Sequence, residues 1–350
     1  MHIESRIVTS TRAEPPRIGV VIPYFQRQAG LLHRALSSIR TQEYSPVQVV
    51  VIDDGSPRAA AEEITATLRS ALPGLTVIRQ ANRGAAAARN AALDALGREI
   101  SAIAFLDGDD YWEPAHLRTA AAALSRGADF YFANQRIEGA TTDCFRKQAR
   151  RDLLANSRPV SEAPGIMQWA GSVAALVAVN NPIGTSSVVF RRAIMPQVRF
   201  PRTLRAAASA EDIWVWWALL MRSSIIMYCL EPTGTYGTAG MGLYQHSTFG
   251  SVRYLVRVAD DLRVRRHVLN SYLLNPGERH LLQELIAVRR EEALVSALHL
   301  LRRRQGNALT EVMYLWRDDP VCAASWCVTL PKLLYAQLRR TSVRSRPDSY

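Results

Sequence analysis

The stretch "AFLDGDDYWEP", residues 104–114, joins an apolar run to three closely spaced carboxylates, those of Asp107, Asp109 and Asp110. The run before it is short, apolar and bounded by polar residues, which predicts a buried strand. Ionised carboxylates this close repel one another, and at the edge of a core they cost free energy unless a cation or a hydrogen-bond network meets them. The stretch therefore predicts a missing partner at the end of a strand.

Similar apolar runs rich in valine and isoleucine recur along the first part of the chain. We predict strands at residues 18–22, 47–52, 75–78, 100–106 and 128–133. Segments with helical spacing lie between them, and this alternation is typical of βαβ units in a mostly parallel sheet. We therefore predict an α/β fold with a Rossmann-like sheet, in which ligands bind beyond the carboxyl ends of the strands.

The chain has 350 residues and a net charge of +12, and the two ends differ in character. Residues 1–16 are polar and lack the apolar stretch of a signal peptide, so we predict a flexible tail. The strand and helix alternation predicts one domain over residues 17–250. Residues 251–350 hold 17 basic against 10 acidic residues and an amphipathic pattern, which predicts a basic helical extension.

Cysteine usage and hydropathy favour a cytoplasmic protein. None of the four cysteines lies in a C-x-x-C pair or at zinc-ligand spacing, which favours reduced thiols. The most apolar segment, "IWVWWALLMRSSIIMYCL" (213–230), is interrupted by Arg222 and predicts a core helix, a turn and a strand. We expect no membrane-spanning helix.

The group Asp107-Gly108-Asp109 is a candidate metal site. If the strand continues this far, the two carboxylates project to the same side, and the glycine allows a ligand to approach the backbone closely. Mg²⁺ or Mn²⁺ takes one or two such carboxylates and completes its shell with substrate phosphates and water. The alternative is a polar turn in which Asp110 caps a short helix.

Two further strand ends carry candidate nucleotide contacts. In "IDDGSP", Asp53 or Asp54 can accept a hydrogen bond from a base or a ribose, and the alternative is a helix N-cap. In "NRGAAAARNAAL", Gly84 opens a helix whose start favours anions, with Arg89 and Asn90 following on that helix. Taken alone, this second segment is an alanine-rich helix.

These motifs occur in one order, and the order is informative. The series "VVIPYF", "VVVIDDGS", "NRGAAAARNAAL", "FLDGDDYW" and "AEDIWVWW" resembles the family-2 glycosyltransferases with the A-type glycosyltransferase fold. The resemblance covers about residues 17–250 and implies an inverting, metal-dependent transfer of one sugar from a nucleotide-diphosphate donor, most simply a UDP-sugar. It implies the following nucleotide contacts: Pro23, Tyr24, Asp53, Asp54, Gly84, Arg89, Asn90, Asp107 and Gly108.

The same resemblance assigns the metal and the chemistry. Asp107 and Asp109 correspond to the D-x-D pair that holds Mg²⁺ or Mn²⁺, and His246 is a further candidate metal ligand. Asp212 corresponds to the general base that deprotonates the acceptor hydroxyl. For Asp212 the alternative is an ordinary helix start with acidic residues in its first turn. The Q-x-x-R-W motif of processive synthases is absent from the sequence.

The partners are less specified by the sequence than the chemistry is. The acceptor is a carbohydrate, a lipid-linked molecule or another hydroxyl compound, and we expect no nucleic acid. The segment "VCAASWCVTLPKLLYAQLRRTSVRSR" (321–346) is either a packed helix with a solvated tail or a peripheral contact with an anionic membrane. The alternative function is a non-catalytic nucleotide-binding or nucleic-acid-binding protein that uses the basic C-terminal region.

Overall fold

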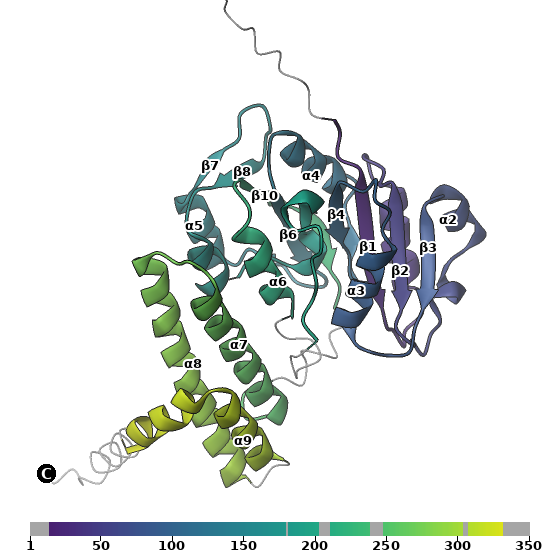
Figure 1. Ribbon diagram of the computed structural model, residues 1–350. Helices are drawn as coiled ribbons and strands as arrows, with labels where there is room; N and C mark the ends of the chain where they lie inside the picture. Colours follow the sequence, from purple (N-terminus) through teal and green to yellow (C-terminus); the bar gives the residue numbers. More distant parts are fainter. Residues whose placement is uncertain (1–13, 180, 203–210, 239–247, 304–306, 332–350) are drawn as a thin grey trace, which may run out of the picture.

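The computed structural model describes residues 14–179, 181–202, 211–238, 248–303 and 307–331. Within these residues ten strands form one sheet, in the order β3-β2-β1-β4-β9-β6-β10-β8-β7, with β5 paired to β10 beside this path (Figure 1). The strands are β1 Ile18–Tyr24, β2 Gln48–Asp53, β3 Leu75–Arg79, β4 Ala102–Phe105, β5 Tyr111–Trp112, β6 Phe130–Ile137, β7 Ser157–Pro159, β8 Ile166–Trp169, β9 Val189–Arg191 and β10 Ile226–Tyr236.

The sheet is mixed, with a parallel half that matches the sequence prediction. Strands β3, β2, β1 and β4 are parallel neighbours, and β6 is parallel to β10. The five predicted strands are β1, β2, β3, β4 and β6, and each differs from its predicted bounds by a few residues at most. The short strand β9 lies antiparallel between β4 and β6 and closes the sheet at its centre.

Helices cover both faces of the sheet and extend beyond it (Figure 1). Their bounds are α1 Leu31–Arg40, η1 Ala60–Glu63, α2 Ala66–Ala71, α3 Ala85–Ala95, α4 His116–Ser125, α5 Lys147–Ala155, η2 Ala175–Val179, η3 Thr185–Ser187, η4 Arg192–Ile194, α6 Glu211–Leu220, α7 Val252–Ser271, α8 Pro276–Arg302 and α9 Ala308–Asp318. Residues 320–331 are also helical.

Strand alternation divides the core between the two faces. In β1, the side chains of Ile18, Val20 and Ile22 pack with those of α1 and α4, whereas Val21 packs on the other face with α3 and α6. Successive side chains of a strand point to opposite faces, so a strand covered on both sides reads as a continuous apolar run. For this reason the parallel strands can be predicted from the sequence.

The segment at residues 213–230 forms the predicted helix, turn and strand, as α6 and the first half of β10. Trp216 of α6 is fully buried, and its ring centroid lies 5.8 Å from Phe105, 5.9 Å from Phe130 and 6.3 Å from Phe200. These aromatic contacts fix α6, and with it the acidic pair at its start, against the centre of the sheet.

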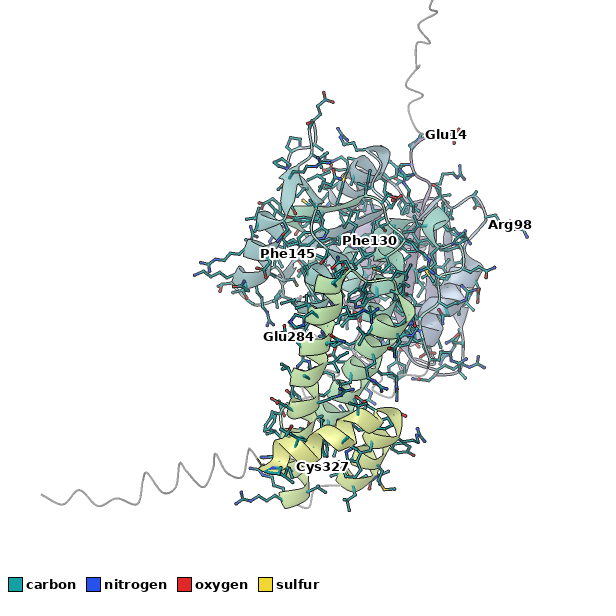
Figure 2. The ribbon with its side chains drawn as sticks, turned by 60° about the vertical axis from the view of Figure 1, so that its left-hand side comes forward. Glu14, Arg98, Phe130, Phe145, Glu284 and Cys327 are labelled. Atoms are coloured by element: carbon teal, nitrogen blue, oxygen red, sulfur yellow. The ribbon has the colours of Figure 1, made fainter. Side chains whose placement is uncertain are left out.

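The C-terminal helices form an arm with a core of its own. Helix α8 begins with a capping box, in which the Asn275 side chain accepts from the Glu278 N–H and the Glu278 side chain accepts in return from the Asn275 N–H. Figure 2 shows Phe130 and Phe145 inside the sheet domain and Cys327 on the arm.

None of the helices in the described part of the chain combines the length and apolar character needed to cross a bilayer. The boundary at residue 250 stays a prediction.

Replacing Trp216 by alanine is expected to lower the free energy of unfolding by about 3–5 kcal/mol, because the change leaves a cavity among three aromatic rings. Urea denaturation followed by circular dichroism measures this loss. Leu309→Ala, at an exposed position, is the control and should change stability by no more than about 0.5 kcal/mol. Equal effects of the two substitutions would contradict the placement of Trp216.

Candidate functional site

The D-x-D group lies in a turn. Strand β4 ends at Phe105, and the Asp110 N–H donates to the Asp107 carbonyl at 3.0 Å to close the turn. The strand therefore does not continue to Asp109, so strand alternation is not what places the two carboxylates on one side. The physical reason is a contact with η3 of the same chain. The Asp107 N–H donates to the Ser186 hydroxyl at 2.9 Å, so a side chain of η3 replaces the next strand partner. The turn itself brings the two carboxylates together.

Gly108 lets this turn approach the end of β1 closely. A Cβ atom there would lie 3.1 Å from the Tyr24 ring and 3.3 Å from the Pro23 carbonyl oxygen. Pro23 is partly exposed at this edge, whereas the Tyr24 ring lies in the core. Burial, and then the charge of Glu63, raise the pKa of Tyr24 to about 12, so its hydroxyl stays protonated.

A buried arginine joins the D-x-D turn to the acidic pair. The Arg89 side chain on α3 donates to Asp107 Oδ1 at 2.7 Å and to Glu211 Oε1 at 3.2 Å, and Arg89 is only 4% exposed. Its guanidinium also lies 5.3 Å from the centre of the Phe200 ring. Burial alone would lower the pKa of Arg89, but the charges of Asp107 and Glu211 outweigh it and raise this pKa.

Asp212 lies in the first turn of α6, directly after Glu211. Its Oδ2 accepts from the Thr185 hydroxyl at 3.3 Å, and its Oδ1 accepts from the Ile213 N–H at 2.7 Å. Burial, and then the charge of Glu211, raise the pKa of Asp212 to about 6, although Arg89 acts in the opposite direction. A carboxyl group with such a pKa is suited to accept a proton near neutral pH.

The D-x-D turn carries more negative charge than the protein neutralises. Burial, and then the charge of Asp107, raise the pKa of Asp109 to about 6. Burial and the two neighbouring carboxylates raise the pKa of Asp110 well above its ordinary value, while its Oδ1 accepts from the Gly237 N–H at 2.7 Å. Arg34 donates to the Asp109 backbone carbonyl at 2.9 Å and leaves the carboxylate itself without this hydrogen bond.

This turn fits a hard divalent cation. The charge excess on Asp107 and Asp109 is the kind that Mg²⁺ or Mn²⁺ offsets, and their donors are all oxygen. Among the described residues, no group of three or more His, Cys, Asp and Glu side chains gathers to hold a metal. A cation at this turn would therefore complete its shell with substrate and water. His246 lies outside the described residues.

The two carboxylates after β2 hold local structure. The Asp53 carboxylate accepts from the Ser56 N–H at 2.8 Å and the Ala60 N–H at 3.0 Å, and so caps η1. The Asp54 carboxylate accepts from the Arg83 N–H at 2.9 Å and the Gly84 N–H at 2.7 Å. Asp53 thus holds the turn after β2 and the first N–H of η1, whose N-cap residue is Ala59, whereas Asp54 ties the end of β2 to the start of α3.

Helix α3 supplies the remaining predicted residues. Gly84, with φ +85°, adopts the left-handed conformation that favours glycine, and it precedes the first turn of α3. The Asn90 side chain donates to the Phe200 carbonyl at 2.9 Å and accepts from the Phe200 N–H at 2.8 Å. Asn90 therefore uses both polar ends to hold the segment that leads toward α6, and Arg89 acts between two acids.

Arg89 contacts Asp107 and Glu211, and Asp212 follows Glu211 on α6. The turn after β4 adds Asp109 to this group. Sequence reasoning missed three participants, Thr185, Ser186 and Arg34. For Thr185 and Ser186, the available signal was the row of hydroxyl groups in "GTSS" (184–187), just before β9. No sequence signal pointed to Arg34, because an arginine on an amphipathic surface helix is ordinary.

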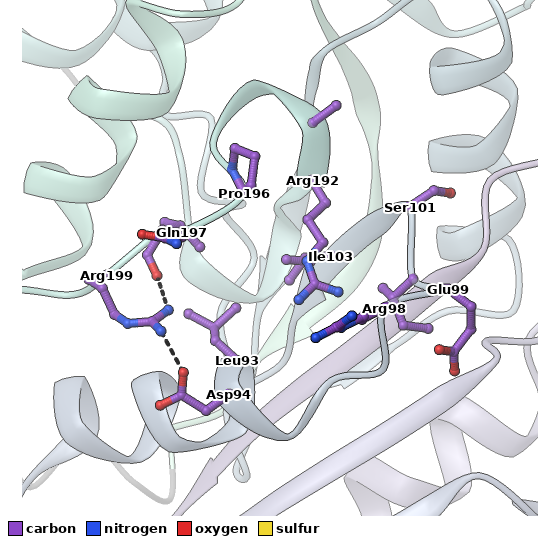
Figure 3. A pocket seen from close by; sticks show the side chains of 13 residues that line it. Leu93, Asp94, Arg98, Glu99, Ser101, Ile103, Arg192, Pro196, Gln197 and Arg199 are labelled. Carbon is purple, nitrogen blue, oxygen red and sulfur yellow. Dashed lines mark hydrogen bonds and ion pairs between the residues drawn. The ribbon is translucent and has the colours of Figure 1, made fainter.

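A cavity of about 630 Å³ lies away from this site, at the amino end of β4 (Figure 3). Its walls include Leu93, Arg98, Ile103 and Arg192, and the ion pair of Arg199 with Asp94 crosses its rim. None of the predicted site residues lines it. Arg89, Asp107, Asp109 and Asp212 instead lie near the carboxyl end of β4, as expected for a ligand site in a parallel sheet.

The raised pKa of Asp212 predicts a pH-dependent stability. The folded protein holds this proton more tightly than the unfolded chain, so the contribution of Asp212 to stability falls as pH rises from about 4 to about 6. Well above pH 6, Asp212→Asn should stabilise the protein, by up to about 3 kcal/mol, and the gain should shrink at pH 4. Urea denaturation at the two pH values measures it, and a destabilising effect at high pH would contradict the raised pKa.

Breaking the buried bridge is expected to be costly. Arg89→Met leaves Asp107 and Glu211 without their shared cation and should lower the free energy of unfolding by about 3–5 kcal/mol. Arg199→Met is the matched control, because it removes an exposed ion pair with Asp94 and should cost less than about 1 kcal/mol. Similar losses in both variants, measured by urea denaturation, would show that Arg89 is not a buried bridge.

The sequence matches a family model and a known protein. Residues 19–172 match the family model "Glycosyl transferase family 2". The chain is 29% identical over 324 residues to the succinoglycan biosynthesis protein ExoW of Rhizobium meliloti (strain 1021), and the match covers 91% of this chain and 99% of that protein.

Solved structures share the fold. S. aureus TarS in complex with UDP has a TM-score of 0.54 and 18% identity, over 77% of this chain and 71% of that chain. The mannosyltransferase PcManGT from Pyrobaculum calidifontis, in complex with GDP-Man and Mn²⁺, has a TM-score of 0.56 and 16% identity, over 94% of this chain and 88% of that chain. Residues 19–172 of the chain therefore match the family-2 glycosyltransferases, and the chain has the A-type glycosyltransferase fold.

Proposed function

We propose that the chain is an inverting, metal-dependent glycosyltransferase that moves a single sugar from a UDP-sugar to an acceptor hydroxyl. The observation that carries the proposal is the buried bridge of Arg89, which connects the D-x-D turn to the acidic pair. Direct displacement at the anomeric carbon needs a base for the acceptor on one side of the sugar and stabilisation of the leaving diphosphate on the other. The bridge connects the groups that would supply these two functions.

Asp212 is the proposed general base. Its hydrogen bonds to the Thr185 hydroxyl and the Ile213 N–H orient the carboxylate, and Glu211 beside it is occupied by Arg89. The proton of the acceptor hydroxyl would pass to an Asp212 oxygen as the hydroxyl attacks the anomeric carbon. A pKa of about 6 leaves this carboxyl group mostly ionised at pH 7 and still basic enough for the transfer.

Asp107 and Asp109 are the proposed residues that hold Mg²⁺ or Mn²⁺. Asp109 is the proposed direct ligand, since Arg89 already occupies Oδ1 of Asp107. When bound, the cation would offset the negative charge of the donor diphosphate. The Asp110 carboxylate accepts from the Gly237 N–H and so ties the turn to the residue after β10, and it is not assigned to the metal.

The proposed nucleotide pocket lies between the ends of β1 and β2 and the start of α3. Pro23, Asp54 and the backbone at Gly84 and Gly108 are the proposed contacts at this edge. Tyr24, Asp53 and Asn90 are proposed to support the pocket, because Tyr24 is buried and the polar atoms of the other two hold neighbouring backbone. Uracil is the preferred base in this proposal, and guanine is the alternative that the experiment must test.

The proposed acceptor is a carbohydrate in polysaccharide biosynthesis. The near full-length match to a protein named for succinoglycan biosynthesis supports this choice of acceptor class. The proposed location is the cytoplasm, where nucleotide sugars are available to the enzyme. Single addition is proposed because the processive Q-x-x-R-W motif is absent from the sequence.

The experiment is a calorimetric titration with UDP and with GDP, in Mn²⁺ and again in EDTA. UDP should bind in Mn²⁺, and the binding should weaken strongly in EDTA and in the Asp109→Ala variant. Asp212→Asn is the matched control, because it changes a site carboxylate that the proposal does not place on the metal. It should keep UDP binding and lose at least about 100-fold in transfer rate.

Two outcomes would contradict the proposal. Tighter binding of GDP than of UDP would overturn the choice of donor base, and metal-independent UDP binding would overturn the role of Asp109. Once a donor sugar is found, proton NMR of the first product formed reports the anomeric configuration. A product with the configuration of the donor would overturn the inverting mechanism and the role of Asp212.

A further inference from the structure

Arg34 on α1 joins distant parts of the chain at the D-x-D turn. Its Nη2 donates to the Asp109 carbonyl at 2.9 Å, and its Nη1 forms an ion pair with Glu138, the residue after β6. The same guanidinium lies 4.5 Å from the centre of the Tyr111 ring. Three groups therefore hold the Arg34 side chain, and its hydrogen bond to Asp109 has a fixed direction.

The acid that holds Arg34 is itself fixed to the sheet. The Glu138 Oε2 accepts from the Thr238 N–H at 3.1 Å, and the Glu138 N–H donates to the Tyr236 carbonyl at the end of β10 at 3.0 Å. Helix α1 is fixed as well, because Leu32 and its apolar neighbours are buried and the Ser38 hydroxyl accepts from the Trp112 N–H at 3.1 Å. Both ends of the link between α1 and β10 are therefore anchored.

Gly237 encloses the same carbonyl from another side. A Cβ atom at Gly237 would lie 2.0 Å from the Asp109 carbonyl oxygen and 3.3 Å from Arg34 Nη2. The first distance is far below a van der Waals contact with backbone, so a side chain here would push the D-x-D turn out of place. The Gly237 N–H also donates to the Asp110 carboxylate at 2.7 Å. The turn is therefore held by Arg34 and by the backbone of Gly237.

Fixing the Asp109 backbone limits where the Asp109 carboxylate can lie. The side chain of an aspartate is short, so its oxygens follow the backbone to which they are attached. Mg²⁺ accepts ligand oxygens only at about 2.0–2.1 Å and in near-octahedral directions, so a small displacement of a ligand lowers affinity. Groups that orient a metal ligand contribute to affinity although they do not touch the metal.

We propose that Arg34 is a positioning residue of the metal site, which holds the Asp109 backbone so that the carboxylate lies where Mg²⁺ or Mn²⁺ binds. This inference rests on the proposed function, in which Asp109 is the direct ligand. The charge of Arg34 acts in the opposite sense, because a guanidinium beside the site repels a divalent cation. Removing Arg34 therefore separates the two effects by sign: lost positioning weakens metal binding, and lost charge alone strengthens it.

The test measures the Mn²⁺ affinity of the full-length protein with UDP, from the electron paramagnetic resonance signal of free Mn²⁺ and against a blank of UDP alone. In Arg34→Met the dissociation constant for Mn²⁺ should rise by about 10- to 100-fold, because the hydrogen bond that orients Asp109 is lost. Arg118→Met is the matched control. It removes an exposed ion pair with Glu43 outside the site and should change the constant by less than about twofold.

A second variant displaces the turn without changing any charge. Gly237→Ala places a methyl group against the Asp109 carbonyl, and its Mn²⁺ affinity should fall by at least about tenfold. Gly277→Ala on α8 is its control, because a Cβ there would make an ordinary contact with Asn275 Oδ1 at 3.4 Å. Circular dichroism at the temperature of the titration checks that every variant is folded.

Three outcomes would overturn the role of Arg34 and leave the proposed metal dependence intact. The first is Mn²⁺ binding by folded Arg34→Met that equals or exceeds that of the unchanged protein. The second is an equal loss in Arg118→Met, and the third is equal binding by Gly237→Ala and Gly277→Ala. If the unchanged protein with UDP binds no Mn²⁺, the metal dependence of the proposed function fails, and the role of Arg34 fails with it.

Discussion

The buried guanidinium of Arg89 is the interaction on which the site depends. Asp107 and Glu211 are 104 residues apart in sequence, and the buried Arg89 side chain forms an ion pair with each of them. The bridge holds the turn after β4 and the start of α6 at a fixed separation. Asn90, one residue further along α3, holds the Phe200 backbone, so one helix positions both the ion bridge and the chain that leads to the acidic pair.

The site combines this neutralised pair with carboxylates that are left unneutralised. Asp109 and Asp212 both have a pKa raised to about 6 by burial and by a neighbouring acid. Such an arrangement costs stability in the absence of ligands and is typical of sites where charge is handled. Arg89 thus holds the geometry of the site. Two carboxylates stay available, that of Asp109 at the proposed metal and that of Asp212 at the proposed acceptor.

The helical arm packs both against the sheet domain and within itself. Its inner side chains form one core with the sheet domain and another among the arm helices. The arm has many basic residues, but several of them form ion pairs with acidic residues of the arm, as Arg290 does with Asp319. Net charge alone therefore overstates the cationic surface.

The sequence by itself determined the parallel strands, the helices between them and the position of the carboxylates after β4, because each follows from a local pattern of apolar and polar residues. The motif order also indicated the family. Tertiary structure alone decided that Asp107 and Asp109 meet through a turn and that Arg89 bridges two acids. It also decided that Asn90 holds the Phe200 backbone. These features depend on which distant segments meet, and no local spacing encodes that meeting.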